Sequence, residues 1–326
     1  MVEIAFVCVA NDQIGWGHLH RVIALYDACV TTKYETLNII VEGQESGLAD
    51  RLGERNHVFF EDRSELIGSL ERSSDSISTV ILDHPVATYD DVDRIAKAAG
   101  PLVLFYSVKR KLIEDYWVKK FIIPRHDGIT PPESLRHVTM VGMEYTPLRP
   151  RFYRAKPHRA VTSISSLFIC LGGSQHVAAL NKVLRMLADL NFNGEVKLVL
   201  GESSEQVASQ YYQVSFDLNV FVGVEENQLI SLIDASDAGL VSSGTVAQEC
   251  FSRGLVCGLV DVAADQKGLS RAYASLGLCL SIDLNSQKSI HELITLDKGR
   301  WSRITKCLTD VDYASALTEL VGAIAG

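Results

Sequence analysis

The sequence lacks the cysteine spacings that build metal sites or secreted disulfide frameworks. It has seven cysteines, an odd number, and no C-x-x-C pair occurs among them. Most lie in apolar runs such as "FVCVA", which indicates buried free thiols in a reducing compartment. No apolar run approaches the roughly 20 residues of a membrane span, and Glu3 and Asp12 stand where a secretory signal would be apolar. We therefore expect a soluble cytoplasmic protein without an integral membrane segment or a metal.

Two nucleotide-binding motifs are missing as well. No G-x-x-x-x-G-K-[ST] sequence occurs, which excludes a P-loop ATPase or kinase. The turn at Gly15 and Gly17 lacks the third glycine of a dinucleotide fingerprint, because His20 stands in its place, and this disfavours a dehydrogenase. Acidic residues outnumber basic ones, 40 to 31, and the net charge of -9 counts against sequence-independent nucleic-acid binding.

What the sequence does contain is a regular alternation of apolar β-type runs with longer amphipathic runs. Continuous apolar strands separated by helices predict parallel sheets that are covered on both faces. We expect an α/β protein of two doubly wound Rossmann-like domains facing across a cleft, residues 1–150 and 151–326, with a hinge at 144–163. The last helix is expected to pack back on the N-terminal domain. The predicted strands are 2–9, 36–42, 57–60, 78–83, 101–107, 166–172, 195–201, 219–223, 238–242, 256–260 and 278–282, and the helices of the first half lie near 18–31, 47–55, 62–72 and 88–99.

Open parallel sheets bind ligands beyond the carboxyl ends of their strands, so the strand-end turns are the candidate sites. The first of these is "IGWGHLHR" (14–21), where Gly15 and Gly17 precede His18 at the start of a helix. Helix starts favour anions and an uncharged imidazole that can accept a proton. Arg21, one turn further, could reach a phosphate or a facing carboxylate. The alternative is a tight turn with a solvated histidine.

Asp83 and His84 end another predicted strand, in "LDHP" (82–85). A carboxylate at such a strand end can orient a catalytic histidine or hold a sugar hydroxyl, whereas its alternative role is to cap the turn before Pro85. Asp91-x-Asp93 has the spacing of a chelating pair, but it lies within a charged helical face, so we expect no metal there.

The second half has strand-end turns of its own, and together they favour nucleotide binding. The run "LGGSQ" (171–175) lets the backbone approach a ligand closely, and "SSGTVAQE" (242–249) offers hydroxyls and amides at a helix start, followed by a carboxylate suited to ribose hydroxyls. A third turn, "DVAADQKG" (261–268), is either on the ligand side or another capped helix start. The candidate residues of these turns are Gly172, Gly173, Ser174, Ser243, Gly244, Thr245, Glu249, Asp265 and Gln266.

These motifs together resemble those of the nucleotide-sugar hydrolase of pseudaminic acid biosynthesis, which releases UDP from a diacetamido-trideoxy hexose. The resemblance rests on "IGWGHLHR" (14–21), "LDH" (82–84), "GMEYTPLRPRF" (142–152), "LGGSQ" (171–175) and "SSGTVAQE" (242–249), over about three quarters of the chain. It implies the architecture of the GT-B glycosyltransferases, UDP in the C-terminal domain, the sugar facing the N-terminal domain, and the histidine matching His18 as general base without a cofactor or an obligatory metal. The chain departs from the family at Asp265, where the family usually has asparagine, and at Val22, where it often has cysteine.

Three functions follow as hypotheses. The first is hydrolysis of a UDP-linked amino or deoxy sugar for surface-glycan precursor synthesis, with His18 deprotonating water and Asp83 supporting it. In this hypothesis the C-terminal turns hold the diphosphate and Glu249 holds the ribose, while Gly15, Gly17, Arg21, His84, Asp265 and Gln266 contact sugar or phosphate.

The second hypothesis is glycosyl transfer to an acceptor. The segment 106–121 carries Lys109, Arg110, Lys111, Lys119 and Lys120 among aromatic residues and could bind a lipid acceptor by peripheral membrane contact; its alternative is a solvated amphipathic helix. The third hypothesis is a non-catalytic sugar-nucleotide-binding subunit, with Asp265 marking lost activity.

Overall fold

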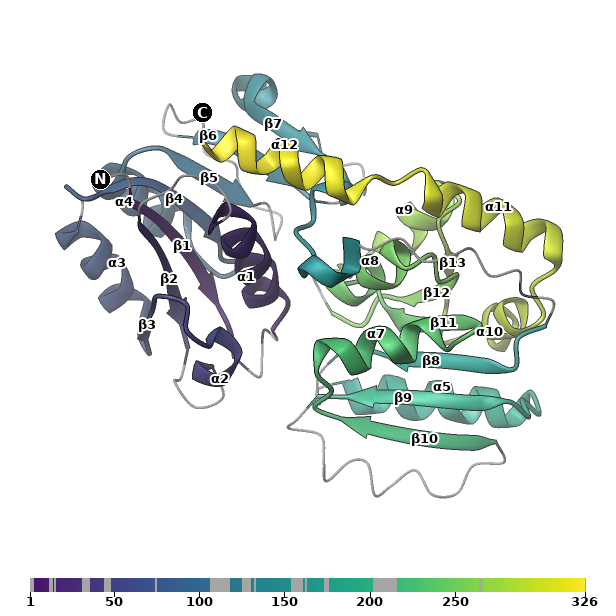
Figure 1. The fold of residues 1–326 in the computed structure, drawn as a ribbon. Coiled ribbons are helices and arrows are strands. Elements are labelled where there is room, and N and C mark those ends of the chain that lie inside the picture. The colour runs from purple at the N-terminus through teal and green to yellow at the C-terminus, as the bar shows by residue number, and fades with distance from the viewer. Residues whose placement is uncertain are drawn as a thin grey trace. The chain divides into compact units, whose positions relative to one another are not determined.

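The computed structural model divides the chain into two compact units (Figure 1). The N-terminal unit comprises Met1–Pro150 together with Tyr313–Gly326, and the C-terminal unit comprises Arg151–Asp312. Each unit is built on one parallel sheet. The structure describes residues 3–11, 14, 16–30, 36–43, 48–73, 75–105, 118–124, 130–131, 133–153, 161, 163–172, 176–201, 216–263 and 266–325.

The N-terminal unit holds seven parallel strands in the order β3-β2-β1-β4-β5-β6-β7. The order reverses between β1 and β4, which makes their carboxyl ends the topological switch point of this sheet. The strands are β1 (Glu3–Val9), β2 (Thr36–Glu42), β3 (His57–Phe60), β4 (Ile77–Asp83), β5 (Leu102–Phe105), β6 (Val118–Ile123) and β7 (Thr139–Val141).

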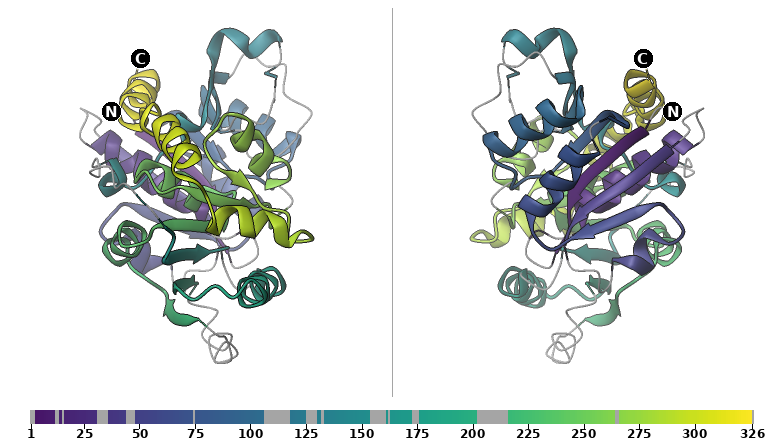
Figure 2. Two further views of the ribbon diagram at one scale, coloured as in Figure 1. Left: turned by 90° about the vertical axis from the view of Figure 1, so that its right-hand side faces the viewer. Right: turned by 90° about the vertical axis from the view of Figure 1, so that its left-hand side faces the viewer.

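Helices cover both faces of this sheet (Figure 2). One face packs against α1 (Gly17–Val30) and the C-terminal helix α12 (Tyr313–Ala325), which contributes Leu320, Val321 and Ile324 to the core. The opposite face packs against α3 (Arg63–Arg72) and α4 (Tyr89–Ala99). The remaining elements are α2 (Ala49–Leu52) and the short 3-10 helices η1 (Glu133–Val138), η2 (Met143–Tyr145) and η3 (Pro150–Tyr153), the last of which begins at the junction of the two units.

The C-terminal unit holds six parallel strands in the order β10-β9-β8-β11-β12-β13, so its switch point lies between β8 and β11. These strands are β8 (Ser166–Cys170), β9 (Glu195–Leu200), β10 (Asp217–Val222), β11 (Ala238–Ser242), β12 (Cys257–Val260) and β13 (Leu280–Ser281). The helices are α5 (Val177–Asp189), α7 (Glu226–Asp234), α8 (Thr245–Ser252), α9 (Leu269–Ser275), α10 (Gln287–Ile294) and α11 (Lys298–Thr309). Two parallel sheets with interleaved helices confirm the predicted α/β class.

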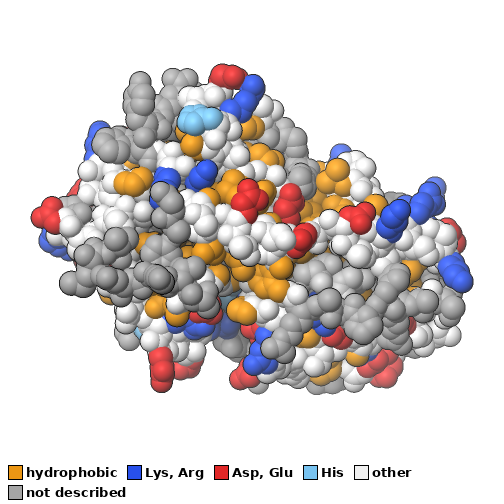
Figure 3. Space-filling view, turned by 45° about the horizontal axis from the view of Figure 1, so that its top comes forward, with side chains coloured by type: hydrophobic (Ala, Val, Ile, Leu, Met, Phe, Trp, Pro, Cys, Tyr) orange, Lys and Arg blue, Asp and Glu red, His pale blue; other side chains and the backbone are white. Residues whose placement is uncertain are grey.

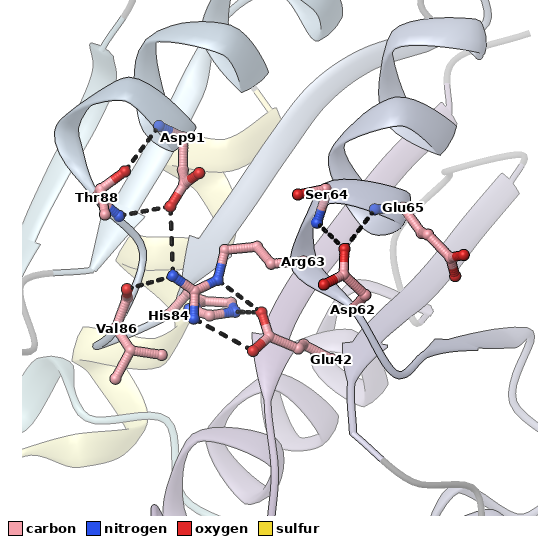
Figure 4. A network of polar contacts seen from close by, with 9 residues as sticks. All are labelled: Glu42, Asp62, Arg63, Ser64, Glu65, His84, Val86, Thr88 and Asp91. Carbon is pink, nitrogen blue, oxygen red and sulfur yellow. Dashed lines mark hydrogen bonds and ion pairs between the residues drawn. The ribbon is translucent and has the colours of Figure 1, made fainter.

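Local sequence explains where the helices beside the N-terminal strand ends begin. Asp62 precedes α3, and its carboxylate accepts hydrogen bonds from the amides of Ser64 and Glu65. Thr88 precedes α4 and forms a reciprocal capping box with Asp91 (Figure 4). The loop after β4 is therefore fixed by the start of the helix that follows it.

Two strands were not predicted from the sequence. We expected 106–121 to be a basic or amphipathic helical segment, but Val118–Ile123 forms β6, with Lys119 donating to the carbonyl of Ile324 in α12. Residues 106–117 lie outside the described part of the chain. The strand β7 (Thr139–Val141) was missed because three residues are too few to show a period.

Candidate functional site

The switch point of the N-terminal sheet brings together three side chains that the sequence placed at separate strand ends. His18 and Arg21 stand in the first turns of α1, which follows β1, and Asp83 ends β4. Nδ1 of His18 lies 2.8 Å from Oδ1 of Asp83, and Arg21 donates through Nε and Nη2 to both carboxylate oxygens at 2.8 and 2.9 Å. The side chain of Asp83 is 1% exposed and that of His18 is 11% exposed.

Asp83 is an ionised carboxylate despite its burial. Burial acts to raise its pKa, but the charges of Arg21 and His18 and their hydrogen bonds outweigh it and hold the pKa of Asp83 well below its usual range. Cys8 of β1 is a neighbour of this carboxylate, and burial, followed by the charge of Asp83, raises the pKa of its thiol well above the usual value. The cluster therefore holds a buried carboxylate with a guanidinium bonded to both of its oxygens.

The position of the histidine proton follows from the same geometry. Nδ1 of His18 lies 2.8 Å from Nη2 of Arg21 as well as 2.8 Å from Asp83, and one nitrogen cannot both donate to the carboxylate and accept from the guanidinium. A lone pair on Nδ1 would face the negative charge of Asp83, whereas a proton there makes a charge-assisted hydrogen bond. We therefore assign the proton to Nδ1, which leaves the lone pair on Nε2.

His84, the residue after β4, belongs to a second network of polar contacts. It was predicted to contact sugar or phosphate, but it is 2% exposed, and its Nε2 lies 2.9 Å from Oε2 of Glu42 at the end of β2. Arg63, the first residue of α3, donates to the same carboxylate at 2.7 Å and to the carbonyl of Val86 at 2.6 Å (Figure 4). The His84 side chain is thus buried in this network, and its contact with sugar or phosphate stays a prediction.

Sequence reasoning missed Glu42 and Arg63. Burial raises the pKa of Glu42, but hydrogen bonds from His84 and Arg63 and their charges lower it to about 2. The available signal was the acid at the end of the run "TLNIIVE", a strand end like that of Asp83. Its partners are 42 and 21 residues away in the chain, so no local pattern indicates them.

Trp16 and His20 lie near the start of α1, and each has contacts that the structure describes. The guanidinium of Arg51 stacks over the Trp16 ring at 4.5 Å, and the amide of His20 donates to the carbonyl of Trp16. Desolvation, with the charges of Arg149 and Arg51, lowers the pKa of His20 to about 3. His20 is therefore uncharged near neutral pH. Gly17 is the first residue of α1, while Gly15 lies outside the described residues.

In the C-terminal unit, Gly172 follows β8 at the switch point. Its φ of +91° is in the region that favours glycine, and an added Cβ would meet His176 at an ordinary 3.6 Å. The backbone conformation, rather than a lack of space, therefore requires glycine there. Gly173 and Ser174, which share the predicted turn, lie outside the described residues.

The turn after β11 leads directly into α8. Gly244 is the N-cap residue, and Thr245 is the first helical residue. The first amides of a helix have no intrahelical acceptor and form the positive end of its dipole, a setting that favours anions. A Cβ on Gly244 would lie 3.1 Å from Nε2 of Gln266, so this predicted residue stands beside the turn, while Asp265 lies outside the described residues.

Ser243 and Glu249 are both buried in the C-terminal unit. Ser243 is 1% exposed, its hydroxyl donates to Asp261 at 2.7 Å and its amide donates to the carbonyl of Val260. Both donors of Ser243 are therefore engaged within the unit, and its contact with a diphosphate stays a prediction. Glu249 is a buried residue of α8. Burial, together with the charge of Glu249, raises the pKa of the Cys170 thiol to about 11.

The described residues contain no group of three or more His, Cys, Asp or Glu side chains placed to hold a metal ion. Within the same residues, every helix is too short or too polar to cross a membrane. On the face shown in Figure 3, basic and acidic side chains of the described residues are interspersed with hydrophobic and neutral ones, so this face has no uniform basic surface.

Comparison with protein-family models and with curated protein sequences found no match. Among solved structures, MurG of Acinetobacter baumannii is 13% identical with a TM-score of 0.63, and 99% of each chain is covered. UGT2 of Phytolacca americana, in complex with UDP-2-fluoro-glucose and pterostilbene, is 11% identical with a TM-score of 0.64 and the same coverage. MnaA of S. aureus, in complex with UDP, is 12% identical with a TM-score of 0.62, covering 98% of this chain and 95% of that one. These likenesses show that the chain has a GT-B fold over nearly its full length.

Proposed function

We propose that the protein transfers a sugar from a nucleotide diphosphate carrier, with UDP as the expected nucleotide, to an acceptor hydroxyl. The observation that carries the proposal is the His18–Asp83 pair at the switch point of the N-terminal sheet. An imidazole oriented by a buried carboxylate is suited to general-base catalysis. The shared fold with MurG, UGT2 and MnaA supports a sugar nucleotide as the substrate class.

In the proposed reaction, His18 acts through Nε2. The Nδ1 proton is held by Asp83, so Nε2 takes the proton of the acceptor hydroxyl as its oxygen attacks the anomeric carbon. The bond from that carbon to the diphosphate breaks, and UDP leaves with the electron pair. Arg21 keeps Asp83 ionised, which stabilises the imidazolium formed in this step.

The C-terminal unit would hold the nucleotide at its own switch point. The amides at the start of α8, around Gly244 and Thr245, suit the negative charge of a leaving diphosphate, and the turn at Gly172–Ser174 adds further amides. Glu249 would accept hydrogen bonds from the ribose hydroxyls, and Asp265 and Gln266 would contact sugar or phosphate. No metal or cofactor enters this proposal.

Hydrolysis is the second candidate, with water in place of the acceptor. It is favoured by the resemblance of "IGWGHLHR" (14–21) and "GMEYTPLRPRF" (142–152) to the pseudaminic acid hydrolase family, together with the contact of His18, Arg21 and Asp83 in one cluster. The substrate would then be a UDP-linked amino or deoxy sugar of surface-glycan synthesis. The same proton transfer by His18 serves both reactions.

A test of this proposal uses His18→Gln, with His137→Gln, an exposed histidine of the same unit, as the matched control. UDP release is measured over a panel of UDP-sugars, with and without hydroxyl acceptors. Loss of a general base should lower turnover by about 10²–10⁴-fold in His18→Gln, while the control keeps its activity. Acceptor-dependent release indicates transfer, and acceptor-independent release indicates hydrolysis. Full activity in His18→Gln, or UDP binding without any turnover by the wild type, would contradict the catalytic assignment.

A further inference from the structure

The end of β4 is anchored on both faces of the sheet. Asp83 is the last residue of β4 and His84 directly follows it, and their side chains contact different partners. Asp83 meets His18 and Arg21 of α1 on one face. On the other face, His84 meets Glu42, which Arg63 of α3 also contacts. One peptide bond therefore joins the carboxylate of the candidate catalytic pair to a second buried network.

The second network crosses the sheet at its carboxyl edge. In the sheet, β1 lies between β2 and β4, with Val9 paired to Glu42 and Cys8 paired to Asp83. The hydrogen bond between His84 and Glu42 thus spans the end of β1 and ties together the strands on its two sides.

Arg63 completes the anchoring of the loop after β4 (Figure 4). Its Nε and Nη2 atoms donate to the two oxygens of Glu42 at 2.7 and 3.2 Å, and Nη1 donates to the carbonyl of Val86 at 2.6 Å. Nη1 also lies 3.4 Å from Asp91, the residue that forms the capping box with Thr88. The chain is therefore held at His84, through Glu42, and again after it, at Val86 and Asp91.

We propose that Glu42 and His84 are positioning residues that fix the end of β4 so that Asp83 holds His18 in the orientation needed for proton transfer. The kinetic part of this inference rests on the proposed function. A general base contributes only when it is well aligned, and a misplacement of about 1 Å can reduce a rate by about 100-fold. His84 is buried and Glu42 is partly buried on the opposite face from His18, so they act through the backbone of β4.

The first test is nuclear magnetic resonance of the substrate-free protein. The Nδ1 proton of His18, hydrogen-bonded to Asp83, should give a far-downfield signal, assigned by its loss in His18→Gln. We expect Glu42→Gln and His84→Leu to shift or broaden this signal, while His84→Gln, which keeps an N–H donor near the position of Nε2, preserves it. Glu71→Gln is the matched control, because it removes a carboxylate paired with Arg94 between α3 and α4 on the surface.

The second test compares steady-state kinetics of the same variants, after circular dichroism has shown that each is folded. We expect kcat to fall by about tenfold in Glu42→Gln and His84→Leu with little change in the KM for the sugar nucleotide, and His84→Gln to restore most of kcat. A purely structural role predicts no change in the His18 signal in folded variants.

The outcomes separate the two proposals. If the His18 signal responds to Glu42→Gln and His84→Leu but the wild type turns over no sugar nucleotide, the proposed function is overturned and the positioning role is supported. If turnover depends on His18 but neither the signal nor kcat differs between Glu42→Gln and Glu71→Gln, the positioning role is overturned. If Glu42→Gln does not fold, the His18 signal and kcat are compared between His84→Leu and His84→Gln instead.

Discussion

Replacing Glu42 by glutamine should make the stability of the N-terminal unit less sensitive to acid. The carboxylate of Glu42 has a pKa of about 2, lowered against the effect of burial by hydrogen bonds from His84 and Arg63. A carboxylate whose folded pKa is lowered stabilises the protein above its unfolded pKa and loses this contribution as the pH falls through the folded value. For Glu42 the window runs from its ordinary 4.5 down to about 2.

The magnitude follows from the width of that window. A shift from 4.5 to about 2 corresponds to about 3 kcal/mol in the free energy of unfolding at neutral pH, at about 1.4 kcal/mol per pKa unit. Linkage predicts that about 2 kcal/mol of this is lost by about pH 3. The side chain keeps 16% exposure, so solvent screening reduces the expected loss to roughly 1–2 kcal/mol. Glutamine carries no titrating carboxyl and should lack this part of the pH dependence.

Urea unfolding at about pH 7 and about pH 3, followed by tryptophan fluorescence, measures the effect, since Trp16 lies in the same unit. The difference in unfolding free energy between wild type and Glu42→Gln should shrink by roughly 1–2 kcal/mol over that range. Glu71→Gln, which removes a surface carboxylate, should show a much smaller change. A constant difference between wild type and Glu42→Gln across the range would refute the reasoning.

Other predictions concern glycines. Gly258→Ala places a Cβ 2.7 Å from Ile282 and 3.0 Å from Leu293, and overpacking should lower the free energy of unfolding by about 1–3 kcal/mol in thermal or urea unfolding. Gly322→Ala, in the exposed middle of α12 with no atom within 4 Å, should instead raise it by about 0.5–1 kcal/mol; a loss of stability would contradict this. Gly244→Ala should displace the amide of Gln266 and weaken UDP binding in calorimetry, whereas unchanged affinity would place the nucleotide elsewhere.

Much of the fold could be predicted because its strands are local and apolar. The bounds predicted for β2, β3 and β11 are those observed, since "TLNIIVE", "HVFF" and "AGLVS" are short runs closed by polar or turn residues. β6 was missed because Lys119 and Lys120 interrupt "VKKFII", and Lys119 finds its carbonyl partner in α12, far along the chain. Likewise the helix expected at 47–55 is observed only as Ala49–Leu52. The next residue, Gly53, has a φ of 58° and caps the end of this helix.

In the candidate site, too, some contacts could be predicted from the sequence and others could not. The meeting of His18 with Asp83 follows from a general rule, because carboxyl ends of neighbouring parallel strands share one edge of the sheet. The partners of His84 could not be predicted, since a buried histidine and an exposed one look alike in sequence. The engagement of Ser243 by Asp261 also depends on how two loops fold against each other, which residue types alone do not determine.

The helix α12 has a consequence for synthesis on the ribosome. Leu320, Val321 and Ile324 complete one core face of the unit that contains the start of the chain. While translation proceeds, this face stays uncovered until every residue of Arg151–Asp312 has been made, so the later unit has all of its own core before the earlier one does. A nascent chain stalled before Tyr313 would therefore present an apolar surface over α1 and β1, of the kind that chaperones bind.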